Sequence, residues 1–357
     1  MNAIPRDDPG TYESRRPLRI LVTGAGGFAG RHLMAQLIAD CSKPDAEPVH
    51  ITATFSSQKA CEQTLPDTTP SNRSIGSIGW LGGTESGFVS SVPMEMRDKR
   101  AIEKVVAEVR PQQIYHLAAR ASGADLERDV MFAVNVAGTR HLLQAASKLL
   151  QSPRVLVVST GYVYGNTDPM RPAKEDDPTA PLWSFGAYTD SKMEMESVAR
   201  SYRGFVITAR AFAHTGAGQT PTFAIPAFAR QLARMEVGLE EPTLRVGNLT
   251  ALRDLLHVRD VVQAYTQIMA HGERGLAYNV ASGRPYPMQD ILDKMRGLCK
   301  VETAIATDPA RLRPAEIACS SGDSSRLHSL TNWLPRIPLE ETLRETLEYW
   351  RAEVEVS

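Results

Sequence analysis

Short runs of apolar, β-branched residues alternate with helical periodicity along the first 212 residues of the chain. LRILVTG (18–24) is almost wholly apolar, ends in glycine, and precedes the helical pattern FAGRHLMAQLIAD (28–40). A second run, VHITATF (49–55), follows a polar turn. Strands that are apolar at every position are buried on both faces, as in parallel sheets covered by helices. The pattern therefore predicts an α/β fold.

The same alternation resumes after an interruption. The predicted helix–strand pairs are 97–111 with IYHLAA (114–119), 133–150 with RVLVVST (154–160), and 188–202 with FVITARAF (205–212). Parallel strands joined through helices cross over with a right hand. The sequence thus predicts a doubly wound parallel sheet, the Rossmann arrangement, over residues 18–212.

Three segments fall outside this rhythm. Residues 1–17 read as a disordered tail, and residues 56–92, rich in Ser, Thr, Gly and Pro, are predicted to be an irregular insertion. Residues 213–357 combine prolines, short strands and a terminal helical pattern, which predicts a smaller, mixed α/β, substrate-binding lobe. Within that lobe, residues 256–272 are predicted to form a helix that returns to the Rossmann domain.

Composition narrows the function classes. The chain has 357 residues, with 40 basic and 41 acidic side chains, and this balance argues against a nucleic-acid binder. No apolar run reaches the roughly 18 residues of a membrane span, and the first residues lack the apolar core of a secretion signal, so a cytoplasmic protein is expected. Four scattered cysteines, Cys41, Cys61, Cys299 and Cys319, suit reduced thiols and predict neither disulfides nor a metal site.

The segment TGAGGFAG (23–30) joins the first strand to the first helix. Gly24, Gly27 and Gly30 permit positive φ and a close approach of the backbone to a pyrophosphate, and the helix N-terminus attracts that anion. At this place in a parallel sheet the motif predicts dinucleotide binding. We expect the intervening Gly26, Phe28 and Ala29 to line the same cofactor.

The end of the second strand bears on the choice of dinucleotide. NAD-binding proteins usually carry a carboxylate there for the ribose 2′-hydroxyl. Here the strand is followed by Ser56, Ser57 and, two residues further, Lys59, which suit a 2′-phosphate. NADP is therefore favoured, with NAD as the alternative. These residues could instead simply begin the insertion.

Tyr188 and Lys192 lie four residues apart in a predicted helix and so share one face. A neighbouring ammonium favours the phenolate, so we expect Lys192 to lower the pKa of Tyr188. Thr160 ends a predicted strand, at the sheet edge where ligands bind, and its hydroxyl can hydrogen-bond the carbonyl oxygen that Tyr188 protonates. The alternative is an ordinary solvated helix face.

Several motifs in order, TGAGGFAG, HLAA (116–119), NVAGT with Asn135, STGYVYG (159–165) and YTDSK (188–192), resemble the extended short-chain dehydrogenase/reductases that act on nucleotide sugars. The resemblance implies a catalytic triad of Thr160, Tyr188 and Lys192. It also implies that Tyr188 and Lys192 contact the cofactor, with Lys192 orienting the nicotinamide ribose. Further implied cofactor contacts are Glu95, Met96, Leu117, Ala118, Ala119 and Asn135, with Glu95 standing where the family more often has Asp.

The second half, in segments such as RVGNLTALRD (245–254) and LRPAE (312–316), is similar to the branch that contains GDP-mannose dehydratases and GDP-4-keto-6-deoxy-D-mannose reductases. The resemblance implies a GDP-sugar substrate. The implied substrate contacts are Ser122, Gly161, Tyr162, Ala213, Asn248, Arg253, Arg313 and Glu316. Arginine suits a diphosphate, although structural ion pairs of Arg253 or Arg313 with Asp254 or Glu316 are the alternative. Ala213 replaces an asparagine of the family pattern.

One position separates the two activities of this branch. Its dehydratases carry a glutamate two residues after the catalytic Thr, where this chain has Tyr162. The resemblance therefore favours NADPH-dependent reduction of the C4 ketone of GDP-4-keto-6-deoxy-D-mannose to GDP-D-rhamnose. There are three alternatives. The first is another nucleotide-sugar 4-ketoreductase or epimerase, for example one that gives GDP-6-deoxy-talose. The second is a GDP-mannose 4,6-dehydratase, and the third is a non-catalytic regulator that senses NADP. The resemblance also implies a homodimer through the helices at 133–150 and 188–202.

Overall fold

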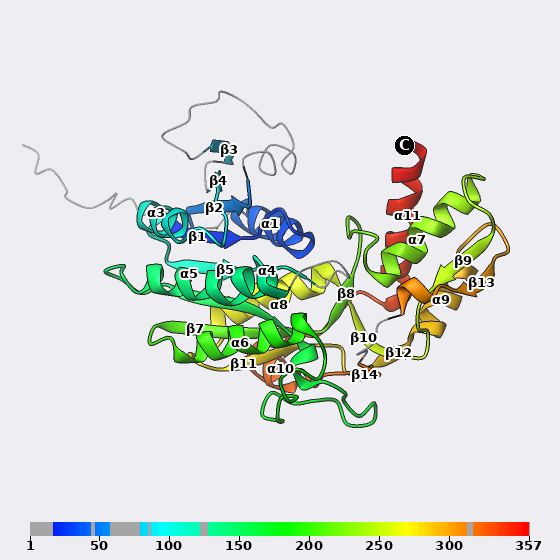
Figure 1. Cartoon of the computed structure of the whole chain (residues 1–357). Coiled ribbons are helices and arrows are strands. Elements are labelled where there is room, and N and C mark those ends of the chain that lie inside the picture. The colour runs from blue at the N-terminus through cyan, green and yellow to red at the C-terminus, as the bar shows by residue number, and fades with distance from the viewer. Residues whose placement is uncertain are drawn as a thin grey trace, which may run out of the picture.

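The computed structural model describes residues 17–43, 47–57, 79–84, 87–121, 128–312 and 317–356. A sheet with helices on both sides forms the larger part of the molecule, and a smaller lobe lies beside it (Figure 1). The tail predicted for residues 1–17 lies outside the described residues, apart from Pro17.

Eight strands of the described residues form one sheet in the order β11-β7-β6-β5-β1-β2-β4-β3. Their bounds are β1 Leu18–Thr23, β2 Val49–Phe55, β3 Gly79–Thr84, β4 Gly87–Pro93, β5 Gln113–His116, β6 Arg154–Thr160, β7 Phe205–Ala211 and β11 Ala277–Val280. All pairings are parallel except that of β3 with β4. The strand order reverses between β1 and β5, and the carboxyl ends beside such a reversal are where open α/β sheets bind ligands.

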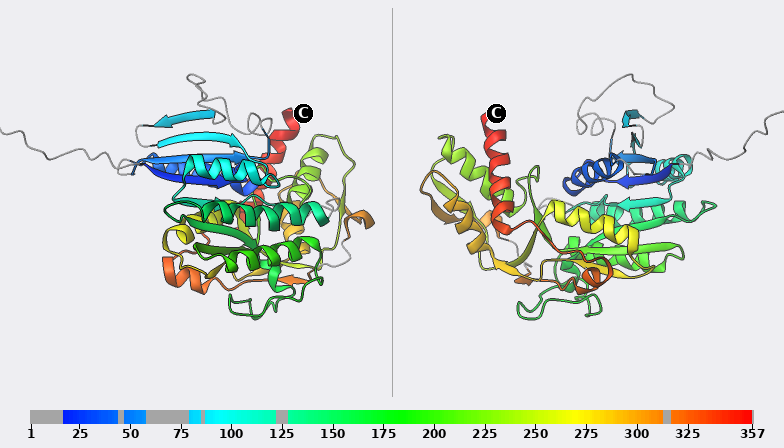
Figure 2. Two further views of the ribbon diagram at one scale, coloured as in Figure 1. Left: turned by 60° about the vertical axis from the view of Figure 1, so that its left-hand side comes forward. Right: turned by 180° about the vertical axis from the view of Figure 1, so that it is seen from behind.

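Helices cover both faces of this sheet (Figure 2). One face carries α1 (Phe28–Cys41), α8 (Val258–His271) and α10 (Ser325–Thr331); the other carries α3 (Lys99–Val109), α4 (Arg128–Phe132), α5 (Thr139–Ala146) and α6 (Ala187–Ser201). Successive β1 residues point to opposite faces, with Ile20 and Val22 in one buried core and Leu21 in the other. The predicted doubly wound parallel fold is confirmed.

The prediction of an irregular insertion over residues 56–92 is wrong in its last part, where β3 and β4 form an antiparallel pair of strands. Residues 87–93 form β4, in parallel register with β2 from Val49↔Gly87 to Phe55↔Pro93. The prediction failed because Ser90 and Ser91 made this stretch look polar, yet both are buried. The Ser90 hydroxyl lies 3.1 Å from His50 Nε2 and 3.2 Å from the Thr52 hydroxyl, so its polarity is satisfied across the strands.

The lobe contains a separate core. Its elements are β8 (Ala213–Thr215), α7 (Ala224–Glu236), β9 (Thr243–Val246), β10 (Leu252–His257), β12 (Pro285–Pro287), α9 (Met288–Gly297), β13 (Ala304–Thr307), β14 (Cys319–Ser320) and α11 (Leu339–Val356). Apolar side chains of α7, α9 and α11 pack together there, among them Leu232, Leu292 and Leu343.

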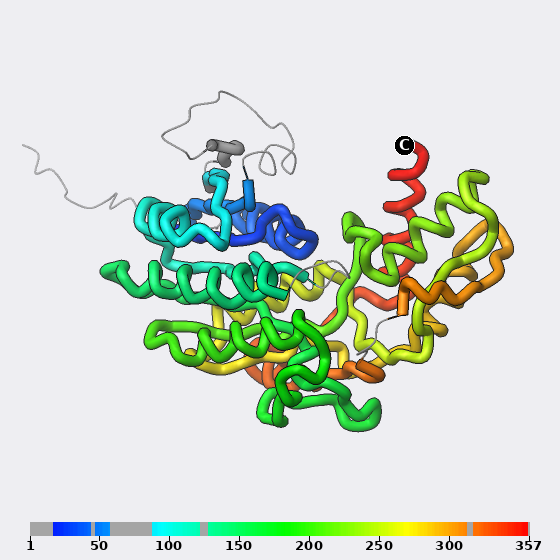
Figure 3. Tube along the Cα trace, viewed as in Figure 1, coloured from blue at the N-terminus to red at the C-terminus, as the bar shows by residue number. Residues whose placement is uncertain are grey.

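The chain returns from the lobe to the sheet more extensively than the sequence indicated (Figure 3). After α8 it continues into β11, which pairs with β7, so the return does not end at residue 272. It returns again at α10, which packs on α8 and β11. The short run of β11 was missed because it contains Asn279, a polar residue that is completely buried.

No helix in the described part of the chain is long and apolar enough to cross a membrane. Cys41, Cys299 and Cys319 carry free thiols, and Cys61 lies outside the described residues.

Candidate active site

The glycine motif forms a cradle that only glycine allows. Gly24 has φ +73°, and a Cβ there would lie 2.6 Å from the backbone nitrogen of Ala118. A Cβ on Gly30 would clash with the carbonyl oxygen of Gly24. The N-cap of α1, Gly27, provides no side-chain hydrogen bond, so the first N–H groups of the helix remain available to an anion. These residues fit the pyrophosphate of a dinucleotide.

The Gly24→Ala variant should bind NADPH at least about 30-fold more weakly, because a left-handed alanine costs about 1–3 kcal/mol and overpacking costs about 1–3 kcal/mol more. Fluorescence titration of NADPH measures this. Gly297→Ala is the matched control, since a Cβ there meets nothing within 4 Å. Equal NADPH affinity in Gly24→Ala and the wild type would show that this loop does not hold the cofactor.

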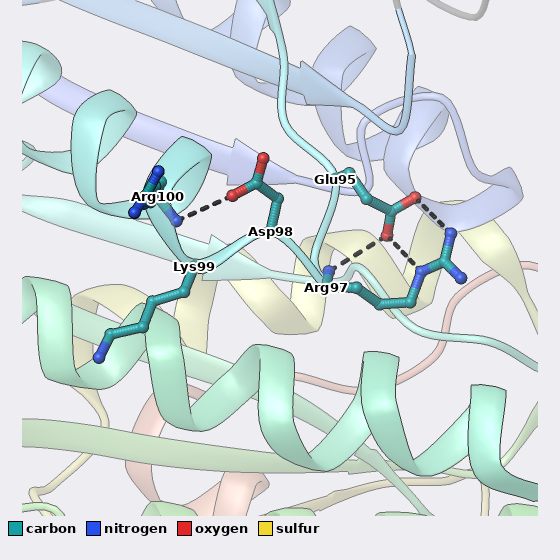
Figure 4. A pocket seen from close by; sticks show the side chains of 5 residues that line it. All are labelled: Glu95, Arg97, Asp98, Lys99 and Arg100. Atoms are coloured by element: carbon teal, nitrogen blue, oxygen red, sulfur yellow. Dashed lines mark hydrogen bonds and ion pairs between the residues drawn. The ribbon is translucent and has the colours of Figure 1, made fainter.

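The ends of β2 and β4 lie side by side where the adenosine of a dinucleotide binds in this fold. The Met94 N–H donates to the Phe55 carbonyl at 2.7 Å, which brings exposed Ser56 and Ser57 next to Glu95. Glu95, Arg97, Asp98, Lys99 and Arg100 line an open pocket of about 490 Å³ (Figure 4). Met96, between Glu95 and Arg97 in the sequence, is buried and does not line this pocket.

Arg97, which was not among the predicted site residues, donates hydrogen bonds to the carboxylate of Glu95. Its backbone N–H, Nε and Nη2 donate at 3.2, 3.3 and 3.4 Å. Partial burial raises the pKa of Glu95, but these hydrogen bonds outweigh it and the net pKa is lowered. Glu95 is therefore anionic at neutral pH.

A buried hydrogen-bond chain supports the loop after β5. Thr139 Oγ1 donates to the Asn135 carbonyl at 2.6 Å, so it accepts from His116 Nε2 at 2.8 Å. The Ala118 N–H donates to Thr23 Oγ1 at 3.2 Å, and Thr23 in turn donates to His116 Nδ1 at 2.7 Å. Burial lowers the pKa of His116 to about 3, which agrees with a neutral ring. Together with the Leu117 N–H, which donates to the Thr23 carbonyl at 3.1 Å, this chain fixes Leu117 and Ala118 against β1.

Asn135 lies in a π-helical turn, residues 133–138, between α4 and α5. Its Oδ1 accepts from the Arg120 N–H at 2.7 Å, and its Nδ2 donates to the Arg120 carbonyl at 3.1 Å and to Ser191 Oγ at 2.9 Å. Both N–H groups of the amide are thus used within the protein. Asn135 therefore joins the loop after β5 to α6, and the cofactor contact implied by the resemblance stays a prediction.

Thr160 and Tyr188 meet at the carboxyl edge of the sheet. Thr160 ends β6 and is buried, and Tyr188 is the second residue of α6. Burial raises the pKa of Tyr188 to about 12, nearby Tyr162 adds to the increase, and a hydrogen bond with Thr160 offsets part of it. The expectation that Lys192 lowers this pKa is therefore not met. Tyr188 is a protonated phenol at neutral pH.

Lys192 lies one turn further along α6 and is buried. Its Nζ donates to the Val158 carbonyl of β6 at 2.8 Å and lies 3.8 Å from Met195 Sδ. Burial lowers the pKa of Lys192 to about 8, and the nearby carboxylate of Glu196 limits the decrease. Its charge therefore changes within the pH range in which enzymes are assayed.

Glu196 and Arg210 form a buried ion pair under α6 that the sequence analysis missed. Arg210 Nε and Nη2 donate to the two carboxylate oxygens of Glu196 at 3.0 and 2.8 Å. Arg210 Nη1 also donates to the Tyr164 hydroxyl at 2.8 Å. The position of Glu196, four residues after Lys192, was the only sequence signal, since Arg210 lies inside an apolar strand.

The predicted substrate residues divide into three groups. Gly161 and Tyr162 adjoin Thr160, and the Arg253 guanidinium carbon lies 5.9 Å from the centre of the Tyr162 ring. Ala213 is in β8, paired with β10, whereas Asn248 lies in an exposed turn, where its Oδ1 accepts from the Thr250 N–H and hydroxyl at 2.9 and 2.8 Å. Ser122, Arg313 and Glu316 lie outside the described residues.

Asp254, the alternative partner of Arg253, is held by neutral donors. Its carboxylate accepts from the Ser282 N–H and hydroxyl at 2.8 and 2.6 Å and from the Gly283 N–H at 2.9 Å. No group of three or more His, Cys, Asp or Glu that could hold a metal occurs in the segments that the structure describes.

The fold and the site define a dinucleotide-binding α/β protein with Thr, Tyr and Lys at the carboxyl edge of its sheet. A sequence profile described as GDP-mannose 4,6 dehydratase matches residues 21–346, and the chain belongs to this family. The resemblance inferred from the sequence motifs is thereby confirmed.

Two relatives represent the two activities of the branch. GDP-6-deoxy-D-mannose reductase of Pseudomonas aeruginosa is 36% identical over 251 residues, covering 68% of this chain and 82% of that protein. GDP-mannose 4,6 dehydratase of Cricetulus griseus is 26% identical over 283 residues, covering 71% and 74%.

Solved structures agree with the fold. RMD from Pseudomonas aeruginosa complexed with NADPH superimposes with a TM-score of 0.73 at 28% identity, covering 94% of this chain and 99% of that one. UDP-glucose 4-epimerase of Thermus thermophilus in complex with NAD has a TM-score of 0.74 at 23% identity over the same shares, and it supports the fold alone.

Proposed function

We propose that this protein is an NADPH-dependent reductase that converts the C4 ketone of GDP-4-keto-6-deoxy-D-mannose to the hydroxyl of GDP-D-rhamnose. The observation that carries the proposal is the protonated Tyr188, hydrogen-bonded with Thr160 and next to Tyr162. A phenol can donate a proton to a developing alkoxide. The elimination of water by a dehydratase needs an acid–base group that Tyr162 does not provide.

The relatives support the same choice. The Pseudomonas aeruginosa reductase is more similar to this chain than the dehydratase is, at 36% against 26% identity. The structural neighbour that holds NADPH supports NADP as the cofactor, and exposed Ser56 and Ser57 at the end of β2 suit its 2′-phosphate.

In the proposed reaction Tyr188 donates its proton to the C4 oxygen, and the Thr160 hydroxyl hydrogen-bonds the same oxygen as charge develops there. Lys192, whose Nζ is anchored on the Val158 carbonyl, would orient the nicotinamide ribose of the bound cofactor. Gly24, Gly27 and Gly30 would hold the cofactor pyrophosphate. A reduced nicotinamide, when bound, supplies the hydride. In this proposal Gly161, Tyr162, Arg253 and the lobe surround the GDP-sugar.

The experiment that tests the function compares two substrates. Purified protein is mixed either with GDP-4-keto-6-deoxy-D-mannose and NADPH or with GDP-mannose and NADP⁺, and both the NADPH absorbance and the sugar product are followed. The proposal expects oxidation of NADPH only with the keto-sugar. Formation of a 4-keto-6-deoxy product from GDP-mannose would establish a dehydratase. NADPH binding without turnover of GDP-, dTDP- or UDP-keto-sugars would support a regulator.

The pH profile of reduction is expected to fall on its alkaline side near pH 8. Lys192 has a pKa lowered to about 8, so it is a cation below that pH and loses its proton above it. Tyr188, with a pKa raised to about 12, stays protonated throughout. kcat/KM should therefore fall about tenfold per pH unit above pH 8. A profile that is flat to pH 10 would show that the charge of Lys192 is not required.

We also propose a homodimer through the helices at 133–150 and 188–202, as the family resemblance implies. Light scattering of the purified protein measures its mass in solution, and a monomeric mass at micromolar concentration would exclude the dimer.

A further inference from the structure

Three side chains from separate segments meet at the first turn of α6. Arg128 begins α4, Trp183 precedes α6, and Asp190 lies within it. The Trp183 N–H donates to Asp190 Oδ1 at 2.7 Å, and Arg128 Nη1 lies 3.6 Å from Asp190 Oδ2. The Arg128 guanidinium carbon also lies 3.8 Å from the centre of the Trp183 ring and 4.7 Å from that of Phe132. We refer to Arg128, Trp183 and Asp190 as the α6 clamp.

The conformation of Trp183 is not what an unconstrained surface residue adopts. Its φ is +72°, a region that disfavours any residue with a Cβ. Its side chain is 65% exposed, so burial of the indole does not hold it there. Such a conformation persists only where surrounding contacts determine it. Here those contacts are the Asp190 carboxylate and the Arg128 guanidinium.

The burial of the Asp190 carboxylate also indicates that Asp190, Trp183 and Arg128 act together. Only 1% of Asp190 is exposed, and a buried carboxylate requires hydrogen bonds and an opposite charge. The Trp183 N–H satisfies one oxygen, and the guanidinium of Arg128 supplies the opposite charge 3.6 Å from the other, which accepts no hydrogen bond from the described residues. Asp190 therefore holds the loop and α4 to α6 at the same time.

The clamp lies at the turn that carries the proposed proton donor. Tyr188 is two residues before Asp190, and Gly186, the N-cap of α6, forms no side-chain hydrogen bond that would fix the start of the helix. The bond from Trp183 to Asp190 supplies this restraint from within the helix, as the second half of a capping box does.

We propose that Arg128, Trp183 and Asp190 are positioning residues that set where the Tyr188 hydroxyl lies relative to Thr160. The proposal rests on the proposed ketoreductase function, because it concerns the same proton donor. The three residues act through the backbone of α6 and its preceding loop. None of them needs to touch the substrate.

Kinetics of four variants test the clamp. Asp190→Ala should lower kcat by about 10–100-fold, as misplacement of a reacting group by about 1 Å does, and should leave the KM for NADPH within about twofold. Asp190→Asn keeps the acceptor for the Trp183 N–H and should recover most of the lost kcat. Trp183→Gly adopts the same φ without strain and should lose less than Asp190→Ala. Arg230→Ala, an exposed arginine near Trp350, is the control and should match the wild type.

Amide hydrogen exchange of residues 181–187 is the second readout and needs no substrate. Exchange there should be faster in Asp190→Ala and in Arg128→Ala, and unchanged in Arg230→Ala. Unchanged exchange in the first two variants would overturn the clamp. Faster exchange with unchanged kcat, or a lower melting temperature with unchanged kcat at a temperature where the variant is folded, would overturn its role in positioning Tyr188.

Failure of the proposed function would look different. In that case the wild type itself would not reduce GDP-4-keto-6-deoxy-D-mannose, whatever the variants do. The exchange measurement would still decide whether Arg128 and Asp190 hold the loop before α6.

Discussion

Replacing Tyr188 with phenylalanine is expected to lower kcat for reduction of the keto-sugar by about 10²–10⁴-fold, the usual contribution of a positioned general acid. The substitution removes one hydroxyl and keeps the ring, so packing of the first turn of α6 is preserved. Because burial raises the pKa of Tyr188 to about 12, its phenol is the protonated form that reduction requires. Affinity for NADPH should stay within about twofold, since the cradle at Gly24 is untouched.

Tyr162→Phe is the matched control for this experiment. It removes a phenol from the same site, two residues after Thr160, but from a residue that donates no proton in the proposed mechanism. Its kcat should stay within about tenfold of the wild type, because only the hydrogen bonds and field around Tyr188 change. If Tyr188→Phe kept the wild-type kcat and Tyr162→Phe lost it, Tyr162 rather than Tyr188 would be the proton donor.

Arg210→Ala is expected to destabilise the protein by about 3–5 kcal/mol, the usual cost of removing one partner from a buried ion pair. Arg210 and Glu196 are 5% and 2% exposed and are joined by two hydrogen bonds. Without the guanidinium, the carboxylate of Glu196 stays buried beneath α6 with most of its compensation lost. Urea unfolding followed by circular dichroism measures the change in free energy.

Arg200→Ala provides a control at the same carboxylate. Arg200 Nη1 lies 3.3 Å from Glu196 Oε2, but the side chain of Arg200 is 58% exposed. Exposed ion pairs contribute about 0–1 kcal/mol, so this variant should unfold almost as the wild type does. Equal losses from Arg210→Ala and Arg200→Ala would show that burial does not decide the strength of the pair.

The strands that could be predicted from the sequence are those with long runs of apolar residues. β1, β2, β6 and β7 are six- or seven-residue runs rich in apolar and β-branched residues, and each is a mostly buried strand of the sheet. β4 and β11 were not predicted because their apolar runs are short and are interrupted by buried polar residues, Ser90 and Ser91 in β4 and Asn279 in β11. Asn279, in β11, donates from Nδ2 to the Ala173 and Asp323 carbonyls at 2.8 and 3.0 Å. Partners so distant in sequence leave no local pattern.

The candidate site shows the same division. Spacing alone indicated that Tyr188 and Lys192 share a helix face, and motif order indicated Thr160 beside them. The pKa values of Tyr188 and Lys192 were not predictable, because they depend on how deeply the two groups are buried. The pairing of Asp190 with Trp183 was equally hidden, since it depends on one left-handed residue.

The most direct test of the account follows the hydride itself. The protein is incubated with GDP-4-keto-6-deoxy-D-mannose and NADPH that carries deuterium at both hydrogen positions of nicotinamide C4, and the product is examined by NMR. The account predicts GDP-D-rhamnose that carries deuterium at C4 of the hexose. A product without deuterium at that carbon, or no product while the protein binds NADPH, would contradict it.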